Sequence, residues 1–178
     1  KTRSTPLFED YTFDNLVLGN ANQMAYAATK QIAENIHGSP YNPFIIYGGS
    51  GLGKTHLMQA AGHLAKAKNP NLKVMYVPLM DFVRNITSSL RHNSIENVKA
   101  FYQSADLLLV DDIHLIAGKE KSQEEFFHIF NFLFNGKKQI IFTCDQSPKK
   151  IKSLEERLKT RFSQGLNLHL TPPELEMR

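Results

Sequence analysis

The chain has 178 residues, of which 42% are hydrophobic and 21% charged, the balance expected of a globular domain with a hydrophobic core. At about 150 residues per domain this length predicts a single domain, and the composition excludes a disordered tail, a collagen-like fibre and a disulfide-rich miniprotein. Lys and Arg outnumber Asp and Glu by 21 to 17, for a net charge of +4, which permits nucleic-acid binding without demonstrating it. The single cysteine, Cys144, cannot form an internal disulfide. No apolar run is long enough to suggest a membrane span, so we expect a cytoplasmic protein.

Strands and helices are predicted to alternate along the chain. Five short apolar runs are typical of buried parallel strands and lie at residues 44–47, 74–77, 107–110, 140–143 and 166–170. The helical spacing of apolar residues predicts helices at residues 21–36, from Lys54 onward, and at 82–90, 95–102 and 122–134. This alternation predicts an α/β fold of three layers, with a central parallel sheet covered by helices on both faces.

Local signals predict where some of these segments begin and end. Asn20 is a candidate cap for the first helix, and Ser122 with Glu125 forms a capping-box pattern that predicts a helix beginning at Ser122. The phenylalanine-rich stretch 126–134 has helical spacing, so we expect it in the core rather than stacked on nucleic-acid bases. The chain is expected to divide into a leader or linker at 1–10, a core at 11–171, and the start of a new helix in the segment 172–178.

Residues 48–55 read GGSGLGKT and fit the phosphate-loop pattern G-x-x-x-x-G-K-[ST]. Glycines let backbone N–H groups approach phosphates closely, and the helix that starts near Lys54 directs its positive end at the same anion. The pattern assigns Lys54 to the β- and γ-phosphates of a nucleotide and the Thr55 hydroxyl to Mg²⁺. A chance glycine-rich turn is the alternative, but the strand before the loop and the helix after it favour nucleotide binding. The residues expected to contact ATP or ADP here are Gly48, Gly49, Ser50, Gly51, Leu52, Gly53, Lys54, Thr55 and His56.

Two carboxylates, Asp111 and Asp112, follow the third predicted strand. In this position Asp111 is expected to organise Mg²⁺ and Asp112 to polarise the attacking water, a task that needs a carboxylate within hydrogen-bond reach. An acidic turn exposed to solvent is the alternative interpretation. The histidines show no tight spacing that would predict a further metal site, and no Ser–His–Asp system supports nucleophilic catalysis.

Six segments occur in a fixed order over nearly the whole chain: YTFDN (11–15), YNP (41–43), YGGSGLGKTHL (47–57), LVDDI (109–113), GKEKSQEEFF (118–127) and RLKTRF (157–162). Together they resemble the nucleotide-binding domain of bacterial chromosomal replication initiators of the DnaA family, which are AAA+ ATPases. The resemblance implies an AAA+ core that binds ATP and Mg²⁺, assembles with copies of itself on origin DNA when ATP is bound, and promotes duplex unwinding. Slow hydrolysis would reset it, so we expect a weak ATPase. The resemblance further implies that residues 172–178 are the start of a truncated helical lid. The implied partners are single-stranded DNA at the core, duplex DNA at a C-terminal domain beyond these residues, and the replicative helicase or regulators.

The resemblance also implies roles for single residues. Asp145 matches a sensor of the γ-phosphate, with an Asx turn before Pro148 as the local alternative. Arg161 matches an arginine finger that reaches the nucleotide of a neighbouring subunit, whereas local Glu–Arg pairs on an exposed helix are the other interpretation. The segment that matches the adenine contact consists of Val17, Leu18, Gly19 and Asn20. The residues that match a path for single-stranded DNA are Thr87, Lys119 and Lys121, although two lysines in a loop are more often solvated surface.

Two other functions stay open at this point. A related AAA+ helicase loader or initiator-like regulator would have nearly the same core, and a C-terminal helix-turn-helix in the longer protein would favour the initiator. A phosphate-loop kinase is disfavoured because Asp111 and Asp112 suit water activation and no arginine-rich lid for a second substrate is evident.

Overall fold

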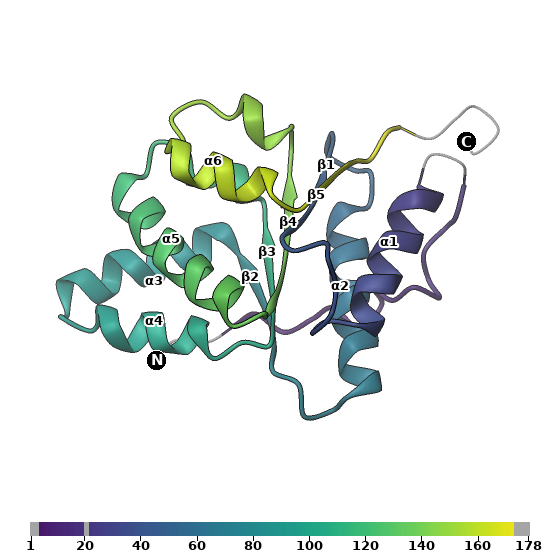
Figure 1. Ribbon diagram of the computed structural model, residues 1–178, viewed down its shortest axis with the longest axis horizontal. Helices are drawn as coiled ribbons and strands as arrows, with labels where there is room; N and C mark the ends of the chain where they lie inside the picture. Colours follow the sequence, from purple (N-terminus) through teal and green to yellow (C-terminus); the bar gives the residue numbers. More distant parts are fainter. Residues whose placement is uncertain (1–3, 20–21, 173–178) are drawn as a thin grey trace.

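The computed structural model describes residues 4–19 and 22–172. Its centre is a parallel sheet of five strands in the order β2-β3-β4-β1-β5 (Figure 1). Each predicted strand is present with its ends within one residue of the prediction, so the α/β fold with a central parallel sheet is confirmed. The strands are β1 (Phe44–Tyr47), β2 (Val74–Pro78), β3 (Leu107–Asp111), β4 (Gln139–Cys144) and β5 (Leu166–His169).

Helices cover both faces of the sheet and give the three predicted layers (Figure 1). One face carries α1 (Gln23–Glu34) and α2 (Lys54–Lys68). The other face carries α3 (Leu79–Arg91), α4 (Ile95–Gln103), α5 (Glu120–Asn135) and α6 (Glu156–Ser163). Two 3-10 turns, η1 (Ile113–Ile116) and η2 (Pro148–Lys150), follow β3 and β4. Among the described residues, none of these helices has the length and apolar character needed to cross a membrane.

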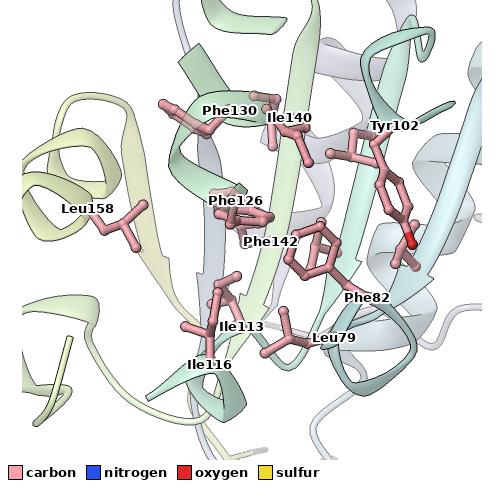
Figure 2. Packing of buried hydrophobic residues seen from close by; sticks show 14 of the residues in the cluster. Leu79, Phe82, Tyr102, Ile113, Ile116, Phe126, Phe130, Ile140, Phe142 and Leu158 are labelled. Atoms are coloured by element: carbon pink, nitrogen blue, oxygen red, sulfur yellow. The ribbon is translucent and has the colours of Figure 1, made fainter. Parts of the chain in front are cut away.

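The sheet separates two hydrophobic cores, as the side chains of β1 show. Ile45 packs beneath α3–α6, whereas Phe44 and Ile46 pack beneath α1 and α2, because alternate side chains of a strand point to opposite faces. The core beneath α3–α6 is rich in aromatic rings, and Phe126 and Phe130 of α5 are buried in it against the sheet (Figure 2). The phenylalanine-rich stretch therefore supplies core side chains, as predicted.

The start of α5 differs from the prediction. The helix begins at Glu120, and the Gln123 N–H already donates to the Lys119 carbonyl at 2.9 Å. Ser122 therefore lies buried within the first turn and makes no cap, so the capping-box prediction is wrong. Glu125, the other member of the predicted capping box, contacts a lysine of α4 and one of its own helix instead. The other predicted cap, Asn20, lies outside the described residues.

The segment expected to be a leader is part of the folded domain from residue 4 onward. The Thr5 N–H donates to the Tyr76 carbonyl at 2.9 Å and forms an antiparallel bridge on the free edge of β2. Further along, the Phe8 N–H donates to Gln59 Oε1 at 2.6 Å. The boundary expected at residue 10 therefore does not separate this segment from the core.

Candidate nucleotide-binding site

The glycine-rich loop connects β1 to α2, as the sequence pattern requires. Gly53 caps α2 with a φ of 91°, a left-handed conformation that favours glycine. Gly48 lies so close to β5 that an added Cβ would stand 2.3 Å from the Leu170 carbonyl oxygen. A side chain at Gly48 would therefore push the end of β5 away from the loop.

Lys54 begins α2 and folds back over the loop. Its Nζ donates to the carbonyl oxygens of Gly48 and Gly49, each at 2.7 Å, and only 8% of the residue is exposed. Among the described residues no carboxylate forms an ion pair with this ammonium. A sheltered cation held only by neutral carbonyls at the start of a helix suits an anionic ligand such as a phosphate chain.

Asp111 ends β3 and lies beside Thr55, the other residue predicted to bind Mg²⁺. The Thr55 hydroxyl stands 2.9 and 3.1 Å from the two Asp111 carboxylate oxygens. Tyr76 and Thr143 also donate hydroxyl hydrogen bonds to this carboxylate, from β2 and β4 respectively. Because Mg²⁺ prefers carboxylate and hydroxyl oxygens, the donor set of Thr55 and Asp111 fits this ion.

Asp112 has a strained backbone. Its φ of 61° and ψ of 52° are left-handed, a conformation that costs a non-glycine residue about 1 kcal/mol or more. Its N–H donates to Thr143 Oγ1 at 2.8 Å, which helps to hold it there. The pKa of Asp112 lies above its usual range, because desolvation and the neighbouring Asp111 carboxylate outweigh the opposing effects of His114 and Lys54. An exposed carboxylate with a raised pKa at a strand end is suited to accept a proton.

Asp145 follows β4 and lies beside His114. The Asp145 N–H donates to His114 Nδ1 at 3.1 Å, and its carboxylate stands 3.5 Å from the same nitrogen. Cys144 completes a group whose potential ligand atoms lie within 4.8 Å of one another, a proximity that the sequence spacing did not predict. Burial raises the pKa of the Cys144 thiol to about 11. The two contacts with His114 position Asp145 at the end of β4.

The remaining predicted nucleotide contacts lie around the N-terminal segment. His56 Nε2 stands 2.7 Å from the Thr12 carbonyl oxygen, and its ring stacks on Tyr11, so its side chain is directed at that segment. Val17 and Leu18 are exposed apolar residues, with 76% and 48% of their surface accessible. Asn20, the fourth residue of the predicted adenine contact, lies outside the described residues.

Arg161 is not brought to the phosphate loop. Its guanidinium donates to Gln164 Oε1 at 3.3 Å and lies 5.8 Å from the ring centre of Phe134. Arg157 forms the local pair with Glu155 at 2.8 Å and stacks over Phe127. Within the described part of the chain neither arginine forms a hydrogen bond with a loop residue.

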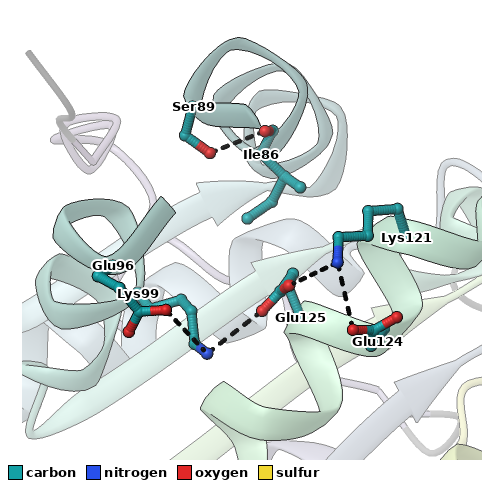
Figure 3. A network of polar contacts seen from close by, with 7 residues as sticks. All are labelled: Ile86, Ser89, Glu96, Lys99, Lys121, Glu124 and Glu125. Atoms are coloured by element: carbon teal, nitrogen blue, oxygen red, sulfur yellow. Dashed lines mark hydrogen bonds and ion pairs between the residues drawn. The ribbon is translucent and has the colours of Figure 1, made fainter. Parts of the chain in front are cut away.

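The residues predicted to contact DNA differ in how far their charges are already paired. Lys121 contacts the carboxylates of Glu124 and Glu125, both at 3.2 Å (Figure 3). Lys119 takes part in no ion pair among the described residues. Thr87 is exposed on α3. A lysine neutralised by its own helix has less charge available for a phosphate.

Tyr76 and Thr143 are site residues that the sequence patterns did not predict. Each lies in an apolar strand, where nothing in the local pattern marks it as functional. Strand register could have found Thr143, because β4 pairs with β3 and ends at the same edge as Asp111.

Comparison with known proteins gives consistent matches. The sequence model described as Bacterial DnaA ATPase domain matches residues 7–169. The chromosomal replication initiator protein DnaA of Chromobacterium violaceum is 51% identical over 175 residues, which are 98% of this chain and 38% of that protein. Domain III of the Thermotoga maritima replication initiation protein DnaA superimposes with a TM-score of 0.93 at 40% identity, covering 97% of this chain and 71% of that one.

A further similar structure holds ligands. A replication initiator DnaA bound to AMPPCP and single-stranded DNA is 41% identical, with a TM-score of 0.89, over 93% of this chain and 51% of that one. The chain spans less than two-fifths of the length of the curated relatives it matches.

Proposed function

The chain belongs to the family of bacterial DnaA ATPase domains, and on this basis we propose that it binds ATP at the phosphate loop and thereby switches assembly of the whole initiator on origin DNA. The observation that carries the proposal is Lys54, a nearly buried ammonium whose hydrogen bonds go only to backbone carbonyls at the start of α2. A phosphate chain would provide this ammonium with a negatively charged partner.

The residues around the loop would each have a separate role toward the nucleotide. Thr55 and Asp111 would hold Mg²⁺, which supplies charge neutralisation at the phosphates when bound. Asp112 would accept a hydrogen bond from the attacking water, a role its raised pKa suits. Asp145, held by His114, would contact the γ-phosphate and report whether ATP or ADP is bound.

Arg161 would complete the site of a neighbouring copy. Its forked donors match phosphate oxygens, and within its own chain it is occupied with Gln164 and Phe134. A copy that lacks the guanidinium of a neighbour would hydrolyse ATP slowly, so ATP persists long enough to act as an assembly signal. We propose that this protein is a weak ATPase and that assembly is the step controlled by ATP.

Single-stranded DNA would follow the exposed surface near α3 and the start of α5, where Thr87, Lys119 and Lys121 lie. Holding the separated strand in an assembled filament would promote duplex unwinding at the origin. Further partners would be the replicative helicase or regulators, in the cytoplasm. The 51% identity to an initiator favours this function over the helicase-loader and kinase alternatives.

Arg161→Ala in the full-length protein tests the proposal. Nucleotide titration should show ATP affinity close to that of the wild type, whereas sedimentation with origin DNA should show loss of ATP-dependent assembly. Lys159→Ala, which removes a positive charge from the same helix, is the matched control and should assemble normally. An Arg161 variant that assembles like the wild type, or one that fails to bind ATP as a monomer, would contradict the role in a neighbouring site.

A further inference from the structure

The Asp111 carboxylate is held from both neighbouring strands on the α2 side of the sheet. Tyr76 of β2 is paired in register with Leu109, and Asp111 lies two residues further along on the same face. The Tyr76 hydroxyl donates to Asp111 Oδ2 at 2.6 Å, and Thr143 of β4 donates to Oδ1. Each carboxylate oxygen therefore has a fixed donor in addition to Thr55.

Tyr76 and Gln59 are both buried, Tyr76 in the core beneath α2 and Gln59 on that helix. Gln59 Oε1 accepts the Phe8 N–H at 2.6 Å, and the Tyr76 carbonyl accepts the Thr5 N–H at 2.9 Å. The N-terminal segment therefore contacts both α2 and the strand that carries Tyr76.

We propose that Tyr76 is a positioning residue whose hydroxyl holds the Asp111 carboxylate in the orientation that receives Mg²⁺ beside Thr55. This inference rests on the proposed function, because it takes Mg²⁺ and ATP as ligands of the loop. Hydrogen-bond partners of a ligating carboxylate fix its orientation, and their loss typically lowers metal affinity by about 10- to 100-fold. Thr143 remains in place without the Tyr76 hydroxyl, so the lower end of that range applies here.

Tyr76→Phe in the full-length protein tests this role, because the substitution removes one oxygen and leaves the ring in the core beneath α2. The measurement is the thermal stabilisation by ATP as Mg²⁺ is titrated, together with ATP binding in EDTA. We expect the Mg²⁺ midpoint to rise about tenfold, with ATP binding in EDTA unchanged. Tyr102→Phe is the matched control, because it removes a buried hydroxyl that hydrogen-bonds Asn85 in the other core, and its midpoint should match the wild type.

The outcomes separate this inference from the proposed function. A rise of the Mg²⁺ midpoint confined to Tyr76→Phe supports the positioning role. An unchanged midpoint, an equal rise in Tyr102→Phe, or weakened ATP binding in EDTA overturns it. If the wild-type protein shows no Mg²⁺-dependent stabilisation by ATP, the proposed function fails instead.

Discussion

The phosphate loop and the start of α5 both place lysines near carboxylates, yet the two regions use these charges in opposite ways. At the loop, Lys54 contacts neutral carbonyls and Asp111 accepts from neutral hydroxyl groups, so neither charge forms an ion pair within the described part of the chain. On α5 and the neighbouring α4, Lys121 and Lys99 are both paired with Glu125 (Figure 3). A lysine is therefore available to an anionic ligand only where the fold has left its charge uncompensated.

Lys54→Ala is expected to have the largest effect, since it removes the unpaired cation of the loop. In the wild type, ATP at about 100 times its Kd should stabilise the protein by about 2.7 kcal/mol, and the variant should lose nearly all of this. The measurement is the melting temperature with and without ATP. Lys66→Ala is the control, because Lys66 is an exposed lysine on the same helix. Full stabilisation of Lys54→Ala by ATP would show that the loop is not the phosphate site.

Glu125→Gln tests the opposite arrangement, in which paired charges stabilise the fold. Burial alone would raise the pKa of Glu125, but Lys121 and Lys99 outweigh it and the pKa lies below its usual value of 4.5. The stabilisation by these ion pairs is therefore complete above pH 4.5, and it is lost as the pH falls through the lowered pKa of Glu125 in the folded state. At pH 7 we expect the free energy of unfolding to fall by about 1 kcal/mol, because Lys121 is half exposed.

Urea unfolding at pH 7 and at successively lower pH provides the measurement for Glu125. The difference between wild type and variant should shrink with acidification, since the wild-type carboxylate becomes neutral. Glu96→Gln, which removes only the exposed partner of Lys99, should change stability far less. Equal stability of Glu125→Gln and wild type at pH 7 would show that the network does not stabilise the domain.

The smallest effects are expected for DNA binding by Lys119 and Lys121. In the full-length protein, the double alanine variant should bind ATP normally but bind single-stranded DNA less tightly and with a shallower salt dependence. Each phosphate contact contributes about 0.7 to the slope of log affinity against log salt concentration. Lys119, which forms no ion pair among the described residues, should account for more of the change in this slope than Lys121. Salt titrations of both single variants check this. Slopes equal to that of the wild type would show that neither lysine contacts a DNA phosphate.

Much of the candidate site could be predicted because its signals are local. The spacing of glycine, lysine and threonine in the loop identifies Lys54 and Thr55, and the position after an apolar strand identifies Asp111. Their proximity then follows from parallel strands whose carboxyl ends meet at one edge. The capping-box prediction at Ser122 was wrong because the same residues can also lie inside a helix: α5 begins at Glu120, and Glu125 pairs with Lys99 of α4.

The five strands, their alternation with helices and the phosphate loop are all encoded locally, because period and spacing are properties of neighbouring residues. The pairing of charges is instead a property of the assembled fold, since Lys99 and Glu125 come from different helices. The fold also brings Tyr76 and Thr143 to Asp111, and Phe8 to Gln59, across distances in sequence that no local pattern spans. Strand register sets the contacts made by Tyr76 and Thr143, and register depends on the packing of the whole sheet.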